Sequence, residues 1–598
     1  MTSGSAASLV LVAREVCKTF RTPLGQEVRA LNQVSFEIPS GTLTALVGPD
    51  GAGKTTLMRL ATGLLPVDTG EVRVLGVDVA VDPAEVQARV AYMPQRFGLY
   101  EDLSVRSNLA LYADLHGVTE PMRQRRVDEL LELTALAPFV SRLAGQLSGG
   151  MKQKLAVACT LIHSPELLLL DEPTVGVDPL SRRELWHLIL NLVKSRGLSV
   201  LISTSYLDEA ERCDYTVVLH EGRVLVQGPP DIVRDVAAGR VFVAEPTPGT
   251  AARTLQARLL DTPAIVDAVP QGGFVRFSRQ YDDPSALSSL DADGTREPIR
   301  VRPTPARFED GFMALLRRAA LQDGHIARVV SFERPLSRRS GEEVVRVDDL
   351  VRQFGAFTAV DHVSFRVRAG EIFGLLGPNG AGKTTTFRML CGLLAATGGT
   401  LRVAGEDLRT AAASARKRIG YVAQKFSLYG PLTVLENLTF FASAYGVAGE
   451  RGRRRIDWAL EQFELRPHQD TPAEQLPGGF KRRLAMAAAL LHEPETLFLD
   501  EPTSGADPLA RREFWRSITA LADQGVTVVV TTHFMEEAEY CDHVAILDQG
   551  RIVAKGTPAQ IRSRGSAEEG SMEDAFIAIV ESGRSSSPLE AADAGGPL

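Results

Sequence analysis

The sequence predicts an α/β chain made of two copies of one domain, and two observations lead to this prediction. The segment VGPDGAGKTT at 47–56 returns as LGPNGAGKTT at 376–385, and Lys383 lies 329 positions after Lys54. The segment LLLLDEPTVGVDPLSRRELW likewise returns as TLFLDEPTSGADPLARREFW, and Asp500 lies 329 positions after Asp171. Equal spacing over so long a stretch indicates a duplicated domain with almost no loop changes inside it.

The size and composition of the chain limit the possible classes of protein. Its 598 residues exceed what one hydrophobic core usually supports, and 44% hydrophobic with 23% charged residues is ordinary for a globular protein. The net charge of -8 gives no overall attraction to nucleic acid. Five cysteines without a CxxC pair indicate neither a disulfide framework nor a zinc site. Without a basic signal segment or an apolar run near 18 residues, the chain is expected to be cytoplasmic.

The two copies differ at their edges, which suggests the domain boundaries. The first copy is followed by strand-like and amphipathic stretches, such as VFVAE and TAARTLQARLL, that the second copy lacks. FEDGFM at 308–313 resembles MEDAFI at 572–577. The predicted segments are a first domain (1–240), a small α/β accessory domain (241–325), a linker (326–342), a second domain (343–565), and a short C-terminal element with a disordered tail (566–598).

Each copy carries the pattern GxxxxGKT between an apolar run and a helical pattern. This is the context of a phosphate-binding P-loop, in which glycines let backbone N–H groups surround the phosphates and lysine reaches the β and γ phosphates. Thr55 and Thr384 are predicted to bind Mg²⁺ through their hydroxyl groups. The candidate ATP-binding residues are Gly48, Gly51, Gly53, Lys54, Thr55 and Thr56, and Gly377, Gly380, Gly382, Lys383, Thr384 and Thr385.

Two buried-strand patterns, LLLLDE and TLFLDE, each end in a pair of carboxylates. Asp171 and Asp500 are predicted to hold hydrated Mg²⁺ as the second carboxylate partner of a P-loop site. Glu172 and Glu501, one position later, are the candidate general bases for an attacking water. The alternative interpretation is an acidic strand end that faces solvent.

The segment LSGGMKQKLAVA, between a P-loop and LLLLDE, resembles the signature motif of ABC ATPases. The order of P-loop, glutamine loop, signature, acidic strand, D-loop and switch loop occurs twice, within about 1–240 and 343–565. The resemblance implies that each domain has a RecA-like core and a helical subdomain, and that the two pair head to tail around ATP. It also implies the roles of further residues: Gln95 and Gln424 at Mg²⁺, Ser148, Gly149 and Gly150 at the γ phosphate, Asp178 and Asp507 in the D-loops, and Phe20 and Phe354 as candidates to stack on adenine.

Two departures from the family pattern predict unequal sites. EQLPGGFKRR has Pro477 where GQLSGGMKQK has Ser148, and STSYLDEAERCD has Ser205 where the other switch loop has His533. Proline is tolerated in the first turn of a helix but removes the serine contacts to phosphate. In a head-to-tail pair both departures fall in one site. Glu501 and His533 are therefore the candidate catalytic residues of the competent site, while Glu172 remains a candidate for slow hydrolysis.

Further stretches resemble the ATPases of ABC-2-type drug exporters. These are RFGLYEDLSVRSNL and KFSLYGPLTVLENL after the two glutamines, together with LPGGF and the MEDAF ending. The resemblance implies an ATP-hydrolysing subunit of a bacterial multidrug exporter, peripheral on the inner face of the plasma membrane, with two membrane permeases and often a periplasmic adaptor protein. The candidate permease contacts, each with the alternative of packing inside the helical subdomain, are Phe97, Leu99, Tyr100, Phe426, Leu428 and Tyr429.

Two other functions remain open at this stage. One is a tandem ABC ATPase that acts on ribosomes or DNA, but the region 241–340 mixes arginine with acidic residues instead of forming a basic linker. The other is the tandem ATPase of a sugar importer, which shares the asymmetry but fits the glutamine-loop and C-terminal sequences less well.

Overall fold

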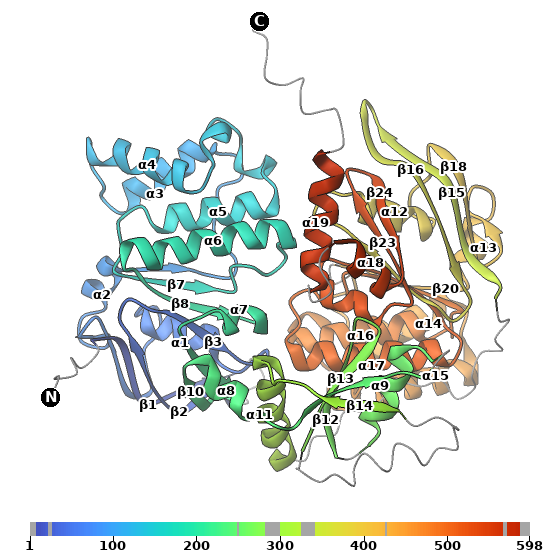
Figure 1. The fold of residues 1–598 in the computed structure, drawn as a ribbon, viewed down its shortest axis with the longest axis horizontal. Coiled ribbons are helices and arrows are strands. Elements are labelled where there is room, and N and C mark those ends of the chain that lie inside the picture. Colours follow the sequence, from blue (N-terminus) through green and yellow to red (C-terminus); the bar gives the residue numbers. More distant parts are fainter. Residues whose placement is uncertain are drawn as a thin grey trace, which may run out of the picture. The chain divides into compact units, whose positions relative to one another are not determined.

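A computed structural model describes residues 8–21, 27–247, 250–262, 264–280, 299–323, 341–424, 427–565 and 571–585. The chain divides into two compact units. The first unit comprises Met1–Val241, Thr304–His325 and Gly505–Leu509, and the second comprises Phe242–Pro303, Ile326–Ser504 and Ala510–Leu598. Figure 1 shows both units and labels their elements.

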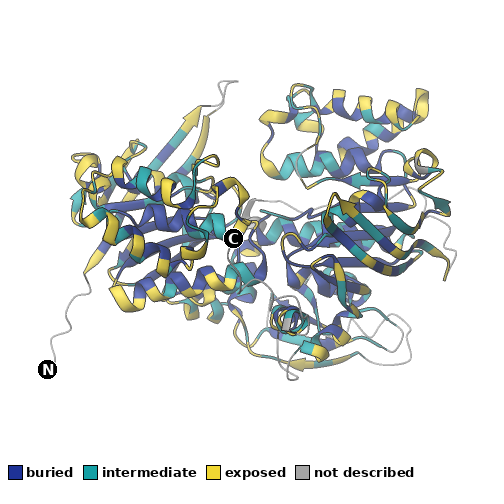
Figure 2. Cartoon of the chain, turned by 90° about the horizontal axis from the view of Figure 1, so that it is seen from above, coloured by how far each residue is buried: buried dark blue, intermediate teal, exposed yellow. Residues whose placement is uncertain are grey.

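The core of the first unit is a six-stranded sheet in the order β10-β9-β3-β8-β7-β6. All neighbours in it are parallel except β9 and β10. The apolar runs LTALV and LLLLD form strands that are buried along their whole length. Figure 2 colours the whole chain by burial. The strands are β3 (Leu43–Val47), β6 (Val90–Met93), β7 (Leu167–Asp171), β8 (Ser199–Thr204), β9 (Tyr215–His220) and β10 (Arg223–Gly228).

An antiparallel sheet in the order β2-β1-β4-β5 and a set of helices complete the first unit. The strands of this sheet are β1 (Leu9–Arg21), β2 (Glu27–Pro39), β4 (Thr69–Val74) and β5 (Val77–Asp78). The helices are α1 (Lys54–Ala61), α2 (Pro83–Arg89), α3 (Val105–Leu115), α4 (Met122–Leu133), η1 (Ala137–Phe139), η2 (Ala144–Gln146), α5 (Gly149–Thr160), α6 (Pro179–Arg196), α7 (Leu207–Glu211), α8 (Pro230–Asp235) and α11 (Phe308–Asp323). Helices α3 to α5 pack together and form the helical part of the domain.

The second unit repeats this arrangement. Its sheets have the orders β20-β21-β22-β17-β23-β24 and β16-β15-β18-β19. The strands are β15 (Glu343–Phe354), β16 (Phe357–Arg368), β17 (Ile372–Leu376), β18 (Gly398–Val403), β19 (Glu406–Asp407), β20 (Ile419–Val422), β21 (Thr496–Asp500), β22 (Thr527–Thr532), β23 (His543–Asp548) and β24 (Arg551–Gly556). The helices are α12 (Lys383–Leu390), α13 (Ala412–Arg416), α14 (Val434–Ala444), α15 (Gly449–Gln462), η4 (Arg466–His468), η5 (Ala473–Gln475), α16 (Gly478–Leu490), α17 (Pro508–Asp523), η6 (Met535–Tyr540), α18 (Pro558–Gly565) and α19 (Met572–Ser585).

Residues 242–303 of the predicted accessory domain also belong to the second unit, and their described part forms a sheet in the order β12-β13-β11-β14 with helix α9. Helix α9 covers this sheet, and Leu255, Leu259, Val275 and Phe277 are buried between them. The elements are β11 (Val241–Glu245), α9 (Ala252–Leu260), β12 (Ile265–Gln271), β13 (Phe274–Arg279) and β14 (Arg300–Pro303).

Helix α11 lies within the 241–325 segment expected as the accessory domain, yet it packs on α7 and α8 of the first unit. Phe308 and Phe312 insert into the core of that unit. Helix α19 packs on α18, η6 and β24 of the second unit and buries Met572 and Phe576. The similar segments FEDGFM and MEDAFI therefore begin helices that close the corresponding ends of the two domains.

No helix in the described part of the chain combines the length and hydrophobicity that a membrane span requires.

Candidate nucleotide sites

Each predicted P-loop connects a buried strand to a helix, β3 to α1 and β17 to α12. Gly53 and Gly382 precede these helices with φ of 103° and 96°, which side-chain-bearing residues rarely adopt. A Cβ atom on Gly53 would lie 2.6 Å from the carbonyl oxygen of Ala30, and one on Gly382 would lie 2.5 Å from that of Ala359. Only glycine fits at these positions, so the loop geometry depends on the predicted sequence pattern.

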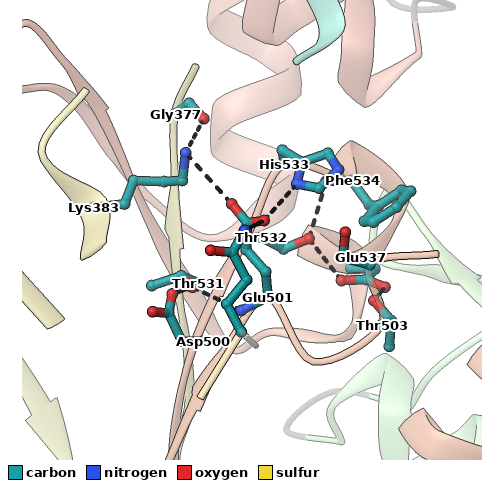
Figure 3. A network of polar contacts seen from close by, with 12 residues as sticks. Gly377, Lys383, Asp500, Glu501, Thr503, Thr531, Thr532, His533, Phe534 and Glu537 are labelled. Carbon is teal, nitrogen blue, oxygen red and sulfur yellow. Dashed lines mark hydrogen bonds and ion pairs between the residues drawn. The ribbon is translucent and has the colours of Figure 1, made fainter. Parts of the chain in front are cut away.

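The two P-loop lysines are buried and fold back over their own loops. Nζ of Lys54 donates to the carbonyl oxygens of Gly48 at 2.7 Å and Pro49 at 3.0 Å. Nζ of Lys383 repeats these contacts with Gly377 at 2.7 Å and Pro378 at 2.9 Å. Each ammonium group therefore lies within the loop where phosphates are predicted to bind, as Figure 3 shows for Lys383.

The aspartates at the ends of the acidic strands are buried and held by the neighbouring strand. Oδ1 of Asp171 accepts a hydrogen bond from the Ser203 hydroxyl at 2.7 Å, and Oδ1 of Asp500 accepts one from Thr531 at 2.5 Å. Burial raises the pKa of Asp500, and the charge of Glu501 adds to this rise. A bound cation would stabilise such a buried carboxylate, and Mg²⁺ binding by these aspartates stays a prediction.

The next residues, Glu172 and Glu501, adopt left-handed backbone conformations with φ of 50° and 46°. Such a conformation costs a non-glycine residue roughly 1–3 kcal/mol and is concentrated at functional sites. The neighbouring strand holds the backbone N–H of each residue, because Glu172 donates to the Ser203 hydroxyl and Glu501 donates to the Thr531 hydroxyl. The alternative of a solvent-facing strand end does not hold for Glu501, which is 8% exposed.

Each of the two glutamates has a glutamine partner within its own domain. Nε2 of Gln95 donates to Oε2 of Glu172 at 2.6 Å, and Nε2 of Gln424 donates to Oε2 of Glu501 at 2.6 Å. The two glutamines therefore lie beside the candidate general bases. Their role at Mg²⁺, which the family resemblance implies, stays a prediction. Within the described residues, no cluster of three or more His, Cys, Asp or Glu side chains forms a metal site on its own.

The surroundings of the two glutamates differ through the switch position. Nδ1 of His533 lies 3.3 Å from Oε2 of Glu501, and the imidazole is buried against Phe534. Nε2 of His533 is buried and has no hydrogen-bond partner among the described residues. In the first unit the matching residue is Ser205, which is also buried and too short to provide an imidazole contact to Glu172.

The pKa values of the two glutamates shift in opposite directions. Burial raises the pKa of Glu172 more than nearby Lys54 lowers it. Burial also acts to raise the pKa of Glu501, but the facing His533 imidazole, Lys383 and Gln424 outweigh it, and the pKa is lowered. The sequence difference at the switch loop thus creates two electrostatically different sites.

The two signature helices begin with different caps. Oγ of Ser148 accepts a hydrogen bond from the Met151 N–H at 3.3 Å and caps α5. Pro477 occupies the same position before α16, makes no side-chain cap, and leaves a helix of 13 residues intact. The structure thus agrees with the expectation that proline preserves the helix, and both cap residues are exposed.

The aromatic candidates have mixed surroundings. Phe20 and Phe354 are 39% and 46% exposed near the ends of β1 and β15, with Lys18 and Arg352 over their rings. Adenine stacking by these rings stays a prediction.

The candidate permease contacts also differ among themselves. Phe97 and Leu99 pack partly into the core of the first unit, while Tyr100 and Tyr429 are exposed. Leu428 is half-buried, and Phe426 lies outside the described residues.

Sequence reasoning missed one buried carboxylate in each domain. Glu537 accepts hydrogen bonds from Thr503 and from Thr532 at 2.7 Å, and Thr532 in turn accepts the Phe534 N–H at 2.9 Å (Figure 3). Glu209 makes the matching contacts in the first unit, where burial raises its pKa to about 7. The sequence signal at this position is the repeated EA dipeptide in LDEAERCD and MEEAEYCD.

The chain is similar to known proteins over most of its length. A family model described as "ABC transporter" matches residues 31–175 and 360–504. The "Probable multidrug ABC transporter ATP-binding protein YbhF" of Escherichia coli (strain K12) is 48% identical over 560 residues, which covers 93% of this chain and 96% of that protein. The "Nod factor export ATP-binding protein I" of Ralstonia nicotianae is 44% identical over 219 residues, covering 36% of this chain and 68% of that protein. A solved "ATP binding subunit of ABC transporter" is 30% identical and covers 40% of this chain and 99% of its own, with a TM-score of 0.37.

Proposed function

Because this chain belongs to the ATP-binding proteins of ABC transporters and is an ATPase with two nucleotide domains, we propose that it drives a bacterial exporter of the multidrug class. The names of its relatives, which refer to multidrug transport and to export, support the exporter class. We further propose that the chain hydrolyses ATP at one competent site. The observation that carries this proposal is the contact between His533 and Glu501, which the first unit lacks.

The proposed competent site is assembled around the second P-loop. Its parts on the second domain are Lys383 for the phosphates, Glu501 for the attacking water and His533 for the γ phosphate. Head-to-tail pairing, as in the family, adds Ser148, Gly149 and Gly150 of the first signature. The other site then combines Ser205 with Pro477, so both departures fall together. Losing a positioned proton or phosphate contact costs on the order of 100-fold in rate, which supports a second site that mainly holds ATP.

The proposed mechanism places each group of the competent site at a specific step. Glu501, ionised because its pKa is lowered, accepts a proton from the water that attacks the γ phosphate. Nε2 of His533, which is buried and has no partner among the described residues, donates a hydrogen bond to the developing charge on the phosphate. ADP and phosphate leave, and the loss of these contacts separates the two domains.

Mg²⁺ is the proposed cofactor, and the residues present fit it. Asp500 and Asp171 offer buried carboxylates, and Thr384 and Thr55 offer hydroxyls at the start of the P-loop helices. When bound, Mg²⁺ would neutralise charge on the β and γ phosphates, while the protein orients these four side chains. Carboxylate and hydroxyl oxygens with water and phosphate are the ligands that Mg²⁺ prefers.

The proposed partners are two ABC-2-type membrane permeases, with a periplasmic adaptor protein in some systems, and the chain would lie on the inner face of the membrane. The exposed Tyr100 and Tyr429 after the two glutamine loops support a docking role there. The proposed domain limits remain those expected from the sequence, except that α11 packs with the first domain.

The proposed single site is tested by steady-state ATP hydrolysis of the full chain with its permeases. Glu501→Gln is expected to lower turnover by about 100-fold or more, while Glu172→Gln is expected to retain most of it. Equal losses from both changes would disprove a single hydrolytic site. The exporter role is tested separately by copurification with membranes against pelleting with ribosomes, since a ribosome-bound chain would disprove it.

A further inference from the structure

The accessory domain is built onto the segment that follows the switch histidine. Strand β12 of its β12–β13 hairpin packs against η6, which begins two residues after His533. The backbone N–H of Gly272, in the turn of this hairpin, donates to Oε2 of Glu539 at 2.7 Å. The other oxygen of Glu539 accepts from Arg562 at 3.1 Å, so both oxygens of this carboxylate are held. The hairpin turn therefore holds Glu539, which lies within the segment 533–542 that we call the switch segment.

A second contact joins the hairpin to η6 through α17. Nε of Arg512 lies 3.3 Å from Oδ2 of Asp267 on β12, and its Nη1 donates to the Tyr540 hydroxyl at 3.1 Å. The Tyr540 ring also stacks on Trp515, with centroids 4.8 Å apart. The side chains of Arg512 and Asp267 are only 10% and 11% exposed. Removing one partner of such a buried pair leaves an uncompensated charge and is strongly unfavourable.

A third contact reaches the strand that leads to the P-loop. Arg253 on α9 donates to Asp523 at 2.8 Å and to Oδ1 of Asp542 at 3.1 Å. Oδ2 of Asp542 accepts the backbone N–H of Ile372, the first residue of β17, at 2.9 Å. Since β17 runs directly to the loop that holds Lys383, the accessory domain is connected to both the switch segment and the phosphate loop.

The first unit presents the corresponding residues to solvent. Arg183 matches Arg512 and Arg212 matches Tyr540, and both are exposed. Asp214 still accepts the N–H at the start of β3, from Leu43 at 2.9 Å. Both domains thus share the aspartate contact to the start of the strand that leads to the P-loop. The buried contacts to a hairpin belong to the domain that carries His533. This difference is unexpected if the accessory domain were only a spacer between the two copies.

We propose that the accessory domain is a positioning element for the competent site, in which Asp267, Gly272 and Arg253 hold η6 and thereby the switch loop with His533. The location of this action rests on the proposed function, because that function assigns hydrolysis to the second P-loop. Loosening η6 would let His533 move away from Glu501 and from the phosphate. A displacement of about 1 Å in a catalytic group costs up to 100-fold in rate without removing ground-state contacts to ATP. Turnover should therefore depend on the accessory domain, and ATP affinity should not.

The experiment compares Asp267→Ala and Arg512→Ala with the matched control Arg183→Ala in the full chain with its permeases. We expect the first two to lower kcat by about tenfold or more while KM for ATP changes less than about twofold. Arg183→Ala should keep the original kcat. The exchanged pair Asp267→Arg with Arg512→Asp should recover part of the loss, because the opposite charges face each other again. An unchanged kcat in Asp267→Ala, or a kcat loss without recovery in the exchanged pair, would overturn the proposal.

Hydrogen exchange provides a readout that does not depend on which site hydrolyses ATP. Asp267→Ala should speed backbone exchange in 533–542 and leave the matching segment 205–214 unchanged. If Asp267→Ala changes the exchange rate of 533–542 no more than that of 205–214, the positioning role is overturned even if activity falls. Measuring Glu501→Gln alongside separates the two proposals: turnover retained in that variant contradicts the single competent site, while the exchange result still decides whether the accessory domain holds the switch segment.

Discussion

Nδ1 of His533 lies 3.3 Å from Oε2 of Glu501, and both side chains are almost fully buried. This contact couples the switch loop to the candidate general base within one domain. Together with Lys383 and Gln424, it lowers the pKa of Glu501 against the raising effect of burial. Ser205 cannot make it, and the pKa of Glu172 is raised. The difference between the two domains can therefore be tested at the switch position itself.

We predict that His533→Ala lowers ATP turnover by about 100-fold, because it removes a positioned donor to the phosphate and a partner of Glu501. Ser205→Ala, the matched change in the first domain, should leave turnover within about twofold of the original. Steady-state release of phosphate by the full chain measures both. A large loss in Ser205→Ala would show that the first switch position also takes part in hydrolysis.

A second prediction concerns the two signature caps. Ser148→Pro should keep α5 folded, because Pro477 precedes an intact helix of 13 residues, α16, in the same chain, but it should lower turnover about as much as His533→Ala. Loss of the cap hydrogen bond that Ser148 accepts from the Met151 N–H would lower stability by only about 1 kcal/mol. Circular dichroism and phosphate release separate these effects. Pro477→Ala is the control and should leave turnover unchanged, so a loss there would contradict the assignment of a holding site.

The sequence predicted the parts of the site whose roles are determined by neighbours in the chain. A glycine before a helix and a carboxylate at the end of an apolar strand have the same surroundings wherever the rest of the protein lies, so Gly53, Gly382, Asp171 and Asp500 occupy the predicted positions. The difference between His533 and Ser205 was also visible, because the two copies could be compared residue by residue.

The parts that the sequence did not predict depend on contacts between distant segments. The accessory strands and helix were expected from their patterns, but periodicity does not say what a buried face meets. Arg512 and Asp267 are 245 positions apart, and nothing near either residue indicates the other. Glu537 lies among acidic residues that suggest an exposed helix start, yet three-dimensional packing buries it beside Thr503 and Thr532. The packing of α11 on α7 and α8 of the first unit is likewise a contact between segments that are distant in the sequence.

A third prediction is a pH dependence in the first domain. Burial raises the pKa of Glu209 from its usual value near 4.5 to about 7, so the folded domain binds this proton more tightly than the unfolded chain does. Its contribution to stability is complete below pH 4.5 and is lost as the pH rises towards 7. Glu209→Gln should therefore flatten this part of the profile. Thermal unfolding of the full chain between pH 5 and 7.5 measures it, and an equally steep fall in Glu209→Gln would contradict the assignment.

A fourth prediction tests the geometry of the second P-loop. Gly382→Ala would place a Cβ atom 2.5 Å from the Ala359 carbonyl oxygen at a φ of 96°, so the loop must shift away from the position that holds Lys383. At Gly380 the φ of 82° is also unfavourable for alanine, but no atom lies within 4 Å of the added Cβ. Gly380→Ala is therefore the control that carries backbone strain without a collision.

We expect Gly382→Ala to weaken binding of a fluorescent ATP analogue by about tenfold or more relative to Gly380→Ala, when the first site is blocked by Lys54→Ala. Equal binding by the two variants would mean that this loop tolerates displacement, and that the close approach to Ala359 does not set its phosphate-binding shape.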